Sequence, residues 1–120
     1  MDSMSISMYR NLKQEAVRQK YNKIYAHELA HKNAAGSLAR GIVIEYNSEG
    51  IPVSGHVDIK MPTVNESDPQ ETIGQANTVI KAALAPSDPS TQDYKVASKA
   101  KKVRDKAEDI QQQKRLDYYA

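Results

Sequence analysis

One short stretch of the chain combines two histidines and a glutamate at a spacing suited to metal chemistry. His27, Glu28 and His31 form an HExxH pattern inside a run of good helix formers. Residues four apart on a helix share a face, with Cβ atoms about 5 to 6 Å apart, so both imidazoles could bind one zinc ion. Glu28 is offset by one position and could take a proton from a zinc-activated water. The pattern therefore predicts zinc-dependent hydrolysis with Glu28 as the general base.

A catalytic zinc site normally has three protein ligands and one open position, so a third ligand must lie elsewhere in the chain. The only other histidine is His56, and we expect it on the polar face of a β-strand that folds back after the helix. Glu71 is the alternative, because a helix-borne glutamate downstream of HExxH is also a known type of zinc ligand. Helix capping explains Glu71 equally well. Glu66 and Asp68 are weaker candidates.

Two other side chains of the same region could assist this chemistry. Asp58 shares a strand face with His56 and could orient its imidazole, although an ordinary surface carboxylate is the simpler interpretation. Tyr46 could donate a hydrogen bond to the oxyanion of a tetrahedral intermediate.

The whole HExxH pattern could also lie on a solvated helix face. Partial burial is favoured by the small and apolar neighbours Ala26, Leu29 and Ala30.

The elements that would carry these residues follow from local sequence signals. Residues 9–35 contain neither Gly nor Pro, and Gly36 follows as a left-handed stop, which together predict a long first helix. Residues 42–46 and 53–59 are rich in β-branched side chains and flank a cluster of turn residues. They predict a β-hairpin, in which Gly55 and His56 point to opposite faces.

Two more helices are predicted in the second half of the chain. Asp68 and Pro69 have the types expected at the N-cap and first turn of a helix that runs to about Leu84. After a proline-containing break, Asp88 or Ser90 could cap a third helix that reaches roughly residue 116. This helix has a narrow apolar stripe that should pack on another helix through small residues, formed by Val96, Ala100, Val103, Ala107 and Ile110.

Length and composition limit the possible classes of protein. At 120 residues the chain should form a single domain over residues 1–120, with an ordered core of about 9–116. The absence of cysteine leaves histidine and carboxylates as the strong metal ligands. We find neither a secretory signal nor an apolar run of about 20 residues, so we expect a cytoplasmic protein without a membrane partner.

The charge pattern argues against a nucleic-acid partner. The net charge is only +2, and the lysines of the third helix alternate with carboxylates and have no aromatic stacking platform among them. An ordinary solvated helix face accounts for both sets of charges. The interleaved carboxylates are Asp93, Asp105, Glu108 and Asp109.

The chain also resembles the SprA-related family, a bacterial family proposed to consist of metalloproteases. The resemblance covers about residues 20–106. At the position of His56 the family pattern usually has glutamate, and because both residue types bind zinc, the exchange supports His56 as the third ligand. The matching segments are Ala26 to His31, Ala34 to Gly36, Val53 to Val57, Thr72 and Ile73, Ala82 to Ser90, Gln92 and Asp93, and Val96 and Ala97.

These observations combine into one expectation of fold and function. We expect a minimal zincin-like α+β domain: a long HExxH-bearing helix, a β-hairpin and two further helices. Zn²⁺ would be held by His27, His31 and His56, and the substrate would be a peptide or protein. The alternative is a zinc-stabilised module that binds another protein without catalysis. A third reading, a metal-free helical protein that binds nucleic acid, predicts strongly salt-dependent binding.

Overall fold

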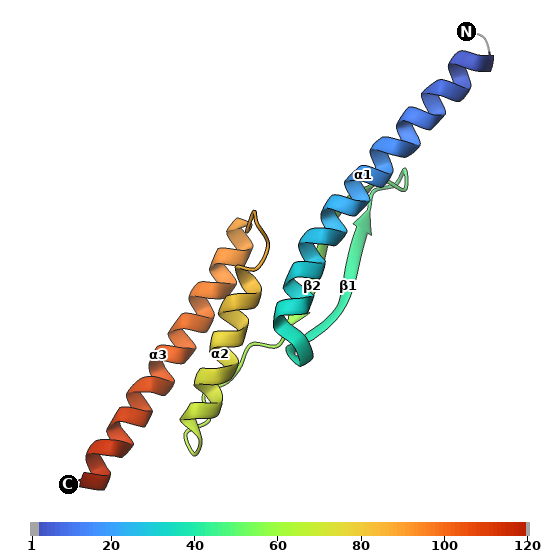
Figure 1. The fold of residues 1–120 in the computed structure, drawn as a ribbon. Coiled ribbons are helices and arrows are strands. Elements are labelled where there is room, and N and C mark those ends of the chain that lie inside the picture. The colour runs from blue at the N-terminus through green and yellow to red at the C-terminus, as the bar shows by residue number, and fades with distance from the viewer. Residues whose placement is uncertain (1–2, 120) are drawn as a thin grey trace.

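The computed structural model describes residues 3–119, which form an elongated molecule of 87 × 21 × 20 Å. Three helices and one antiparallel hairpin follow each other along the chain (Figure 1). The fold is therefore α+β, with the predicted order of elements. Its elements are helix α1 (Ser3–Ala35), a short 3₁₀ turn (Gly36–Leu38), strands β1 (Ala39–Tyr46) and β2 (Pro52–Ile59), and helices α2 (Pro69–Ala83) and α3 (Thr91–Tyr119).

Helix α1 is longer than predicted but ends where the sequence indicated. It begins at Ser3 rather than Tyr9, and its first turns project away from the other elements, so that Leu12 is 66% exposed (Figure 1). The helix stops at Gly36, whose φ of 57° is the predicted left-handed conformation. Only the second half of α1 packs on other elements, and this half carries the HExxH segment. No helix within residues 3–119 is long and apolar enough to cross a membrane.

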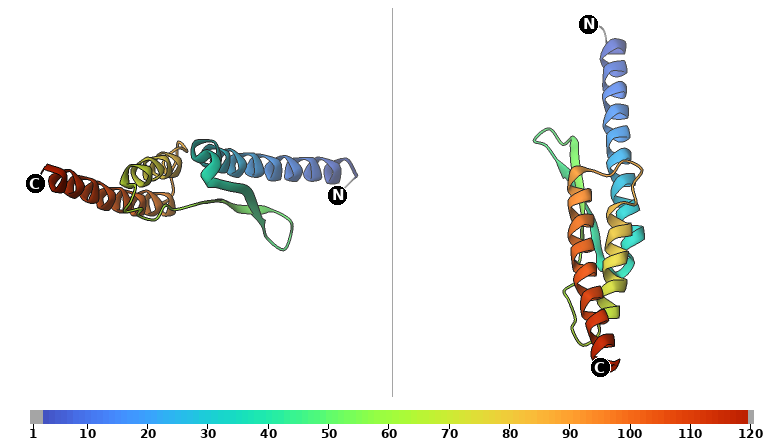
Figure 2. Two further views of the ribbon diagram at one scale, coloured as in Figure 1. Left: turned by 90° about the horizontal axis from the view of Figure 1, so that it is seen from below. Right: turned by 90° about the vertical axis from the view of Figure 1, so that its left-hand side faces the viewer.

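The hairpin packs on this second half of α1, and its turn extends away from the helix (Figure 2, left). Its strands pair in antiparallel register, with Val43 opposite His56 and Ile44 opposite Gly55. The turn is closed by the Asn47 side chain, whose Oδ1 accepts hydrogen bonds from the backbone N–H groups of Glu49 and Ile51 at 2.9 and 3.0 Å. Because side chains alternate along a strand, Gly55 faces α1 and His56 faces away from it.

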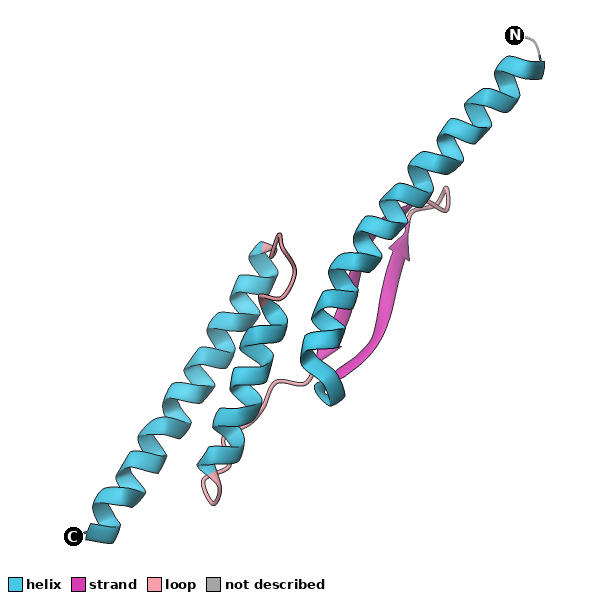
Figure 3. Ribbon diagram, viewed as in Figure 1, coloured by secondary structure: helices cyan, strands magenta, loops and turns pink. Residues whose placement is uncertain are grey.

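Helices α2 and α3 run side by side as a second layer (Figure 3). They approach closely because the buried residues between them are small. The stripe predicted for the third helix is confirmed at Ala100 and Ala107, whereas Val96, Val103 and Ile110 are only half-buried and Ala97 is buried in addition. Asp68 is the N-cap of α2 as predicted, and its Oδ1 accepts a hydrogen bond from the Glu71 N–H at 3.2 Å. The fully buried contacts include Ala76, Val79, Ala82, Ala97, Ala100 and Ala107.

Candidate metal centre

His31 is the most constrained residue of the HExxH segment. It is only 5% exposed, and its Nδ1 lies 2.7 Å from the Ala82 carbonyl oxygen at the end of α2. A carbonyl can only accept, so Nδ1 carries the proton and donates it. In the neutral ring this leaves the Nε2 lone pair free. A backbone carbonyl commonly holds the outer nitrogen of a metal-binding histidine in this way.

His27 lies one helical turn earlier and is oriented in the same manner. Its Nδ1 lies 3.2 Å from Oδ1 of Asp88, in the loop between α2 and α3. A carboxylate accepts this hydrogen bond when Nδ1 carries the proton, and in that neutral tautomer the lone pair is on Nε2. The Nε2 atoms of His27 and His31 lie only 3.2 Å apart. In the neutral Nδ1–H tautomers, both imidazoles present a lone pair to the same small volume.

Asp93, at the start of α3, completes this group, and we did not predict it as a ligand. Its Oδ2 lies 3.1 Å from Nε2 of His27, and its Oδ1 lies 3.1 Å from Nε2 of His31. The interpretation of Asp93 as part of a solvated helix face was wrong, because its side chain is only 15% exposed. Packing of α3 on α2 turns the first turn of α3 toward α1 and removes this carboxylate from solvent.

A capping box holds the Asp93 carboxylate in place. The Ser90 N–H donates to Oδ2 of Asp93 at 2.9 Å, and the Asp93 N–H donates to Oγ of Ser90 at 3.1 Å. Ser90, rather than Asp88, is therefore the N-cap of α3. The Ser90-x-x-Asp93 spacing was the available sequence signal for an ordered carboxylate at this helix start, although it does not reveal what the carboxylate faces.

The donor set fits a divalent cation. The Nε2 atoms of His27 and His31 and the Asp93 carboxylate all act as acceptors in their neutral or ionised forms, yet they converge within about 3.2 Å. Such an arrangement of lone pairs is repulsive unless a proton or a metal ion lies between them. Two imidazoles and one carboxylate are a known ligand combination for catalytic zinc.

Glu28 lies beside this group and is almost completely buried, with 7% exposure. One potential ligand atom from each of His27, Glu28 and His31 lies within 4.8 Å of the others. Burial raises the pKa of Glu28, and the nearby His31 and His27 offset this effect only in part. A carboxylate with a raised pKa is a better proton acceptor than an exposed one, as general-base catalysis requires.

Gly55 of β2 allows the hairpin to approach Glu28 closely. A Cβ atom at position 55 would lie 2.7 Å from Cγ2 of Ile24, 3.0 Å from Cγ of Glu28 and 3.2 Å from the Val43 carbonyl oxygen. These separations are shorter than normal van der Waals contacts. The absence of a side chain at this position therefore sets the distance between β2 and the HExxH helix.

We expect Gly55→Ala to destabilise the protein by about 1 to 3 kcal/mol, because the methyl group overpacks the contact between α1 and β2. Urea denaturation followed by circular dichroism measures this change. Gly41→Ala is the matched control in β1, since nothing lies within 4 Å of the added Cβ there. Equal free energies of unfolding for the two variants would contradict the close packing at Gly55.

His56, predicted as the third ligand, lies outside the group formed by His27, His31 and Asp93. Its side chain is 45% exposed and borders the cavity that His27, His31 and Asp93 also line, but its Nδ1 lies 3.2 Å from Oε1 of Glu45. The geometry therefore favours Asp93 over His56. The reason is the strand alternation itself, because the residue that faces the HExxH helix is the neighbouring Gly55.

The remaining predicted candidates also lie outside the group. Glu71 is exposed at the start of α2, and its carboxylate accepts from the side-chain amides of Asn65 and Gln75 at 3.4 Å. Asp68 is engaged as the cap of α2, and Glu66 is exposed in the preceding loop. Asp58 borders a cavity beside the site, whereas Tyr46 is 53% exposed and lines neither of the cavities described next.

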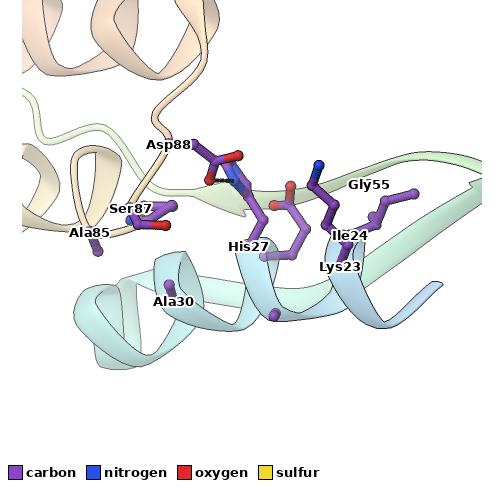
Figure 4. Close-up of a pocket in the computed structure, with 11 residues that line it drawn as sticks. Lys23, Ile24, His27, Ala30, Gly55, Ala85, Ser87 and Asp88 are labelled. Carbon is purple, nitrogen blue, oxygen red and sulfur yellow. Dashed lines mark hydrogen bonds and ion pairs between the residues drawn. The ribbon is translucent and has the colours of Figure 1, made fainter. Parts of the chain in front are cut away.

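Two cavities meet at His27, Glu28 and Gly55. The first, of about 650 Å³, lies between α1 and the loop of residues 85–88, and Figure 4 shows His27 and Asp88 joined across it. The second, of about 460 Å³, lies between residues 55–59 of β2 and the start of α3. The three converging acceptors border the second cavity. A substrate could therefore reach the candidate metal centre from either side of Glu28.

The charges of the group shift the pKa values of its members. Burial alone would lower the pKa of His27, but its hydrogen bonds to Asp88 and Asp93 outweigh burial and raise the pKa above its ordinary value. Burial acts to raise the pKa of Asp93, but hydrogen bonds from Ser90 and the positive charge of His31 lower it. Asp93 therefore remains ionised when His27 becomes protonated.

Stabilisation by zinc is expected to be lost as the pH falls through the raised pKa of His27. Without metal, protonated His27 stabilises the fold below its ordinary pKa of about 6.5, and this contribution disappears as the pH rises through the raised value. Zinc binds only the neutral ring, so its contribution to stability increases as the pH rises. At a free zinc concentration of 100 times its Kd, it should add about 2.7 kcal/mol to the free energy of unfolding. Melting temperatures with zinc and with chelator, between pH 5.5 and 8.5, test this. A zinc-induced increase that does not vary with pH would contradict it.

The fold and this site define a class: an α+β protein whose long helix carries HExxH next to an ordered aspartate. The chain belongs to the SprA-related family, because the family model matches residues 6–118. No curated protein and no solved structure matches the chain.

Proposed function

We propose that the protein is a zinc-dependent peptidase, with His27, His31 and Asp93 as zinc ligands and Glu28 as general base. The observation that carries this proposal is the convergence of two imidazole Nε2 atoms and one carboxylate within about 3.2 Å beside a buried glutamate. Three protein ligands leave one position for water or substrate, as in catalytic zinc sites.

Each residue has a distinct task in this mechanism. Zinc, when bound, supplies the Lewis acidity that makes water nucleophilic near neutral pH and polarises a carbonyl group. Glu28 accepts the proton of the attacking water on its carboxylate and then delivers it to the leaving amine. Ala82 and Asp88 hold the outer nitrogens of His31 and His27, so that both Nε2 atoms stay directed at the same point.

The strand beside the site favours a peptide as substrate. The sheet has only the strands β1 and β2, so β2 has one edge without a partner strand among the described residues. The second cavity follows residues 55–59 of β2 and contains the candidate ligands. An extended peptide could add to this edge through backbone hydrogen bonds, which would bring one of its carbonyl groups to Glu28.

A non-catalytic zinc module remains the second candidate, because Glu28 lies close enough to be a fourth ligand. Four protein ligands would close the coordination sphere and make the ion structural. The zinc module and the peptidase differ in the role of Glu28. In the module, Glu28 is a fourth ligand and contributes to zinc affinity. In the peptidase, it is the general base and contributes only to the rate of the reaction.

Zinc-dependent cleavage of an unfolded protein tests the proposal. We expect zinc-loaded protein to generate new amino termini in reduced, alkylated casein, identified by mass spectrometry. Chelation should stop the reaction and added zinc should restore it. His31→Ala protein, purified and loaded in parallel, controls for a contaminating protease. Cleavage that is equal in the variant, or insensitive to the chelator, would overturn the proposal.

A further inference from the structure

The first cavity contains a positive charge that the proposed mechanism does not use. Lys23 lines it together with His27 and Glu28, and Figure 4 shows that Lys23 and His27 rise from α1 on the same side. The rest of the lining is mainly small or apolar. It includes Ile24, Ala26, Ala30, Gly55, Ala85 and Pro86.

Lys23 has no ion-pair partner within 4.0 Å among residues 3–119. Two carboxylates line the same cavity: Glu28, which is buried, and Asp88, whose Oδ1 lies 3.2 Å from Nδ1 of His27. Lys23 is also the only lysine or arginine that lines either cavity, whereas the second cavity is bordered by the carboxylates of Asp58 and Asp93. Among the described residues that line the two cavities, Lys23 is therefore the one lysine or arginine that could pair with a negatively charged group.

The spacing along α1 relates this charge to the candidate metal centre. Lys23 precedes His27 by one helical turn, which separates their Cβ atoms by about 5 to 6 Å. An extended peptide advances about 3.3 Å per residue. A group that meets the Lys23 ammonium would thus belong to a residue within about two positions of the bond at Glu28.

We propose that Lys23 forms a carboxylate-binding subsite for the peptide substrate in the first cavity, whereas Asp58 borders the second. This inference rests on the proposed peptidase function. The carboxylate could belong to an aspartate or glutamate side chain, or to the carboxyl terminus of the peptide. Both sources offer the same chemistry to the exposed ammonium group of Lys23 at the edge of the cavity.

Peptide hydroxamates, which bind a catalytic zinc ion without being cleaved, provide the probes. Two series of probes are used, each with a peptide part of tripeptide length. In one series the peptide part precedes the hydroxamate, and in the other it follows the hydroxamate. Each series contains a glutamate probe and its glutamine counterpart, and the series with a free carboxyl end also contains acid and amide forms. Dissociation constants are measured by calorimetry on zinc-loaded wild type, Lys23→Gln, Lys23→Glu and Lys20→Gln. Lys20 is an exposed lysine of the same helix that lines neither cavity.

In one series, we expect a carboxylate to tighten binding about fivefold in wild type and in Lys20→Gln, a typical effect of a partly exposed ion pair. The gain should vanish in Lys23→Gln and become a penalty in Lys23→Glu, while neutral probes bind all four proteins equally. A difference between the glutamate and glutamine probes identifies a side-chain carboxylate as the ligand of Lys23. A difference between the acid and amide probes identifies a terminal carboxylate. A gain that persists in Lys23→Gln, or is absent from wild type while neutral probes bind, would overturn the subsite alone. Failure of every hydroxamate to bind zinc-loaded wild type would overturn the proposed function together with it.

Discussion

Asp93→Asn protein is expected to lose its zinc, whereas His56→Ala protein is expected to keep about one ion per chain, as a single three-ligand site requires. Asp93 contacts both Nε2 atoms of the HExxH histidines at 3.1 Å, but His56 pairs with Glu45. Asparagine preserves the acceptor for the Ser90 N–H, so the cap of α3 remains. Because the negative charge is lost, we expect zinc affinity to fall on the order of 100-fold or more.

Metal content by mass spectrometry and competition with a fluorescent chelator measure this effect. Asp109→Asn is the matched control, since it removes an exposed carboxylate from the same helix. His31→Ala should lose zinc as Asp93→Asn does. If Asp93→Asn protein keeps its zinc and His56→Ala protein loses it, His56 is the third ligand. The hairpin would then have to rearrange when the metal binds.

Glu28→Gln protein is expected to bind zinc like the wild type but to cleave peptides about 10² to 10⁴ times more slowly. Glutamine has nearly the same size as glutamate and should fit the same buried position against Gly55. It cannot accept the proton of the attacking water, which is the role proposed for Glu28. Because burial disfavours the charged form of Glu28, the metal-free variant should be at least as stable as the wild type.

Initial rates on a casein-derived peptide, with zinc content measured on the same samples, test this expectation. Glu45→Gln is a suitable control because that carboxylate is exposed on the hairpin. A Glu28→Gln protein that loses zinc together with activity would instead support four-ligand coordination and the non-catalytic module. Full activity in the variant would remove Glu28 from the mechanism.

The proposed site depends on contacts between distant parts of the chain. His31 is oriented by the last turn of α2, His27 by the loop before α3, and Asp93 by the cap of α3. The segment from Ala82 to Asp93 thus supplies all three contacts to the HExxH helix.

The sequence by itself determined the elements of this protein and two of its candidate ligands. The HExxH spacing requires His27 and His31 to share a helix face, because an α-helix has 3.6 residues per turn. Gly36, Asp68 and the two strands were also predictable, since turn conformation, capping and β-propensity depend on neighbouring residues.

Only the tertiary structure decided which other residue faces these histidines. His56 and Asp93 are both polar residues at predictable local positions, one on a strand and one in the first turn of a helix. Local rules could not reveal that the hairpin turns Gly55 toward α1, or that packing on α2 buries the first turn of α3 beside His27 and His31. The third side chain of the group is set by contacts more than 60 residues apart in the chain, and those depend on how whole helices pack.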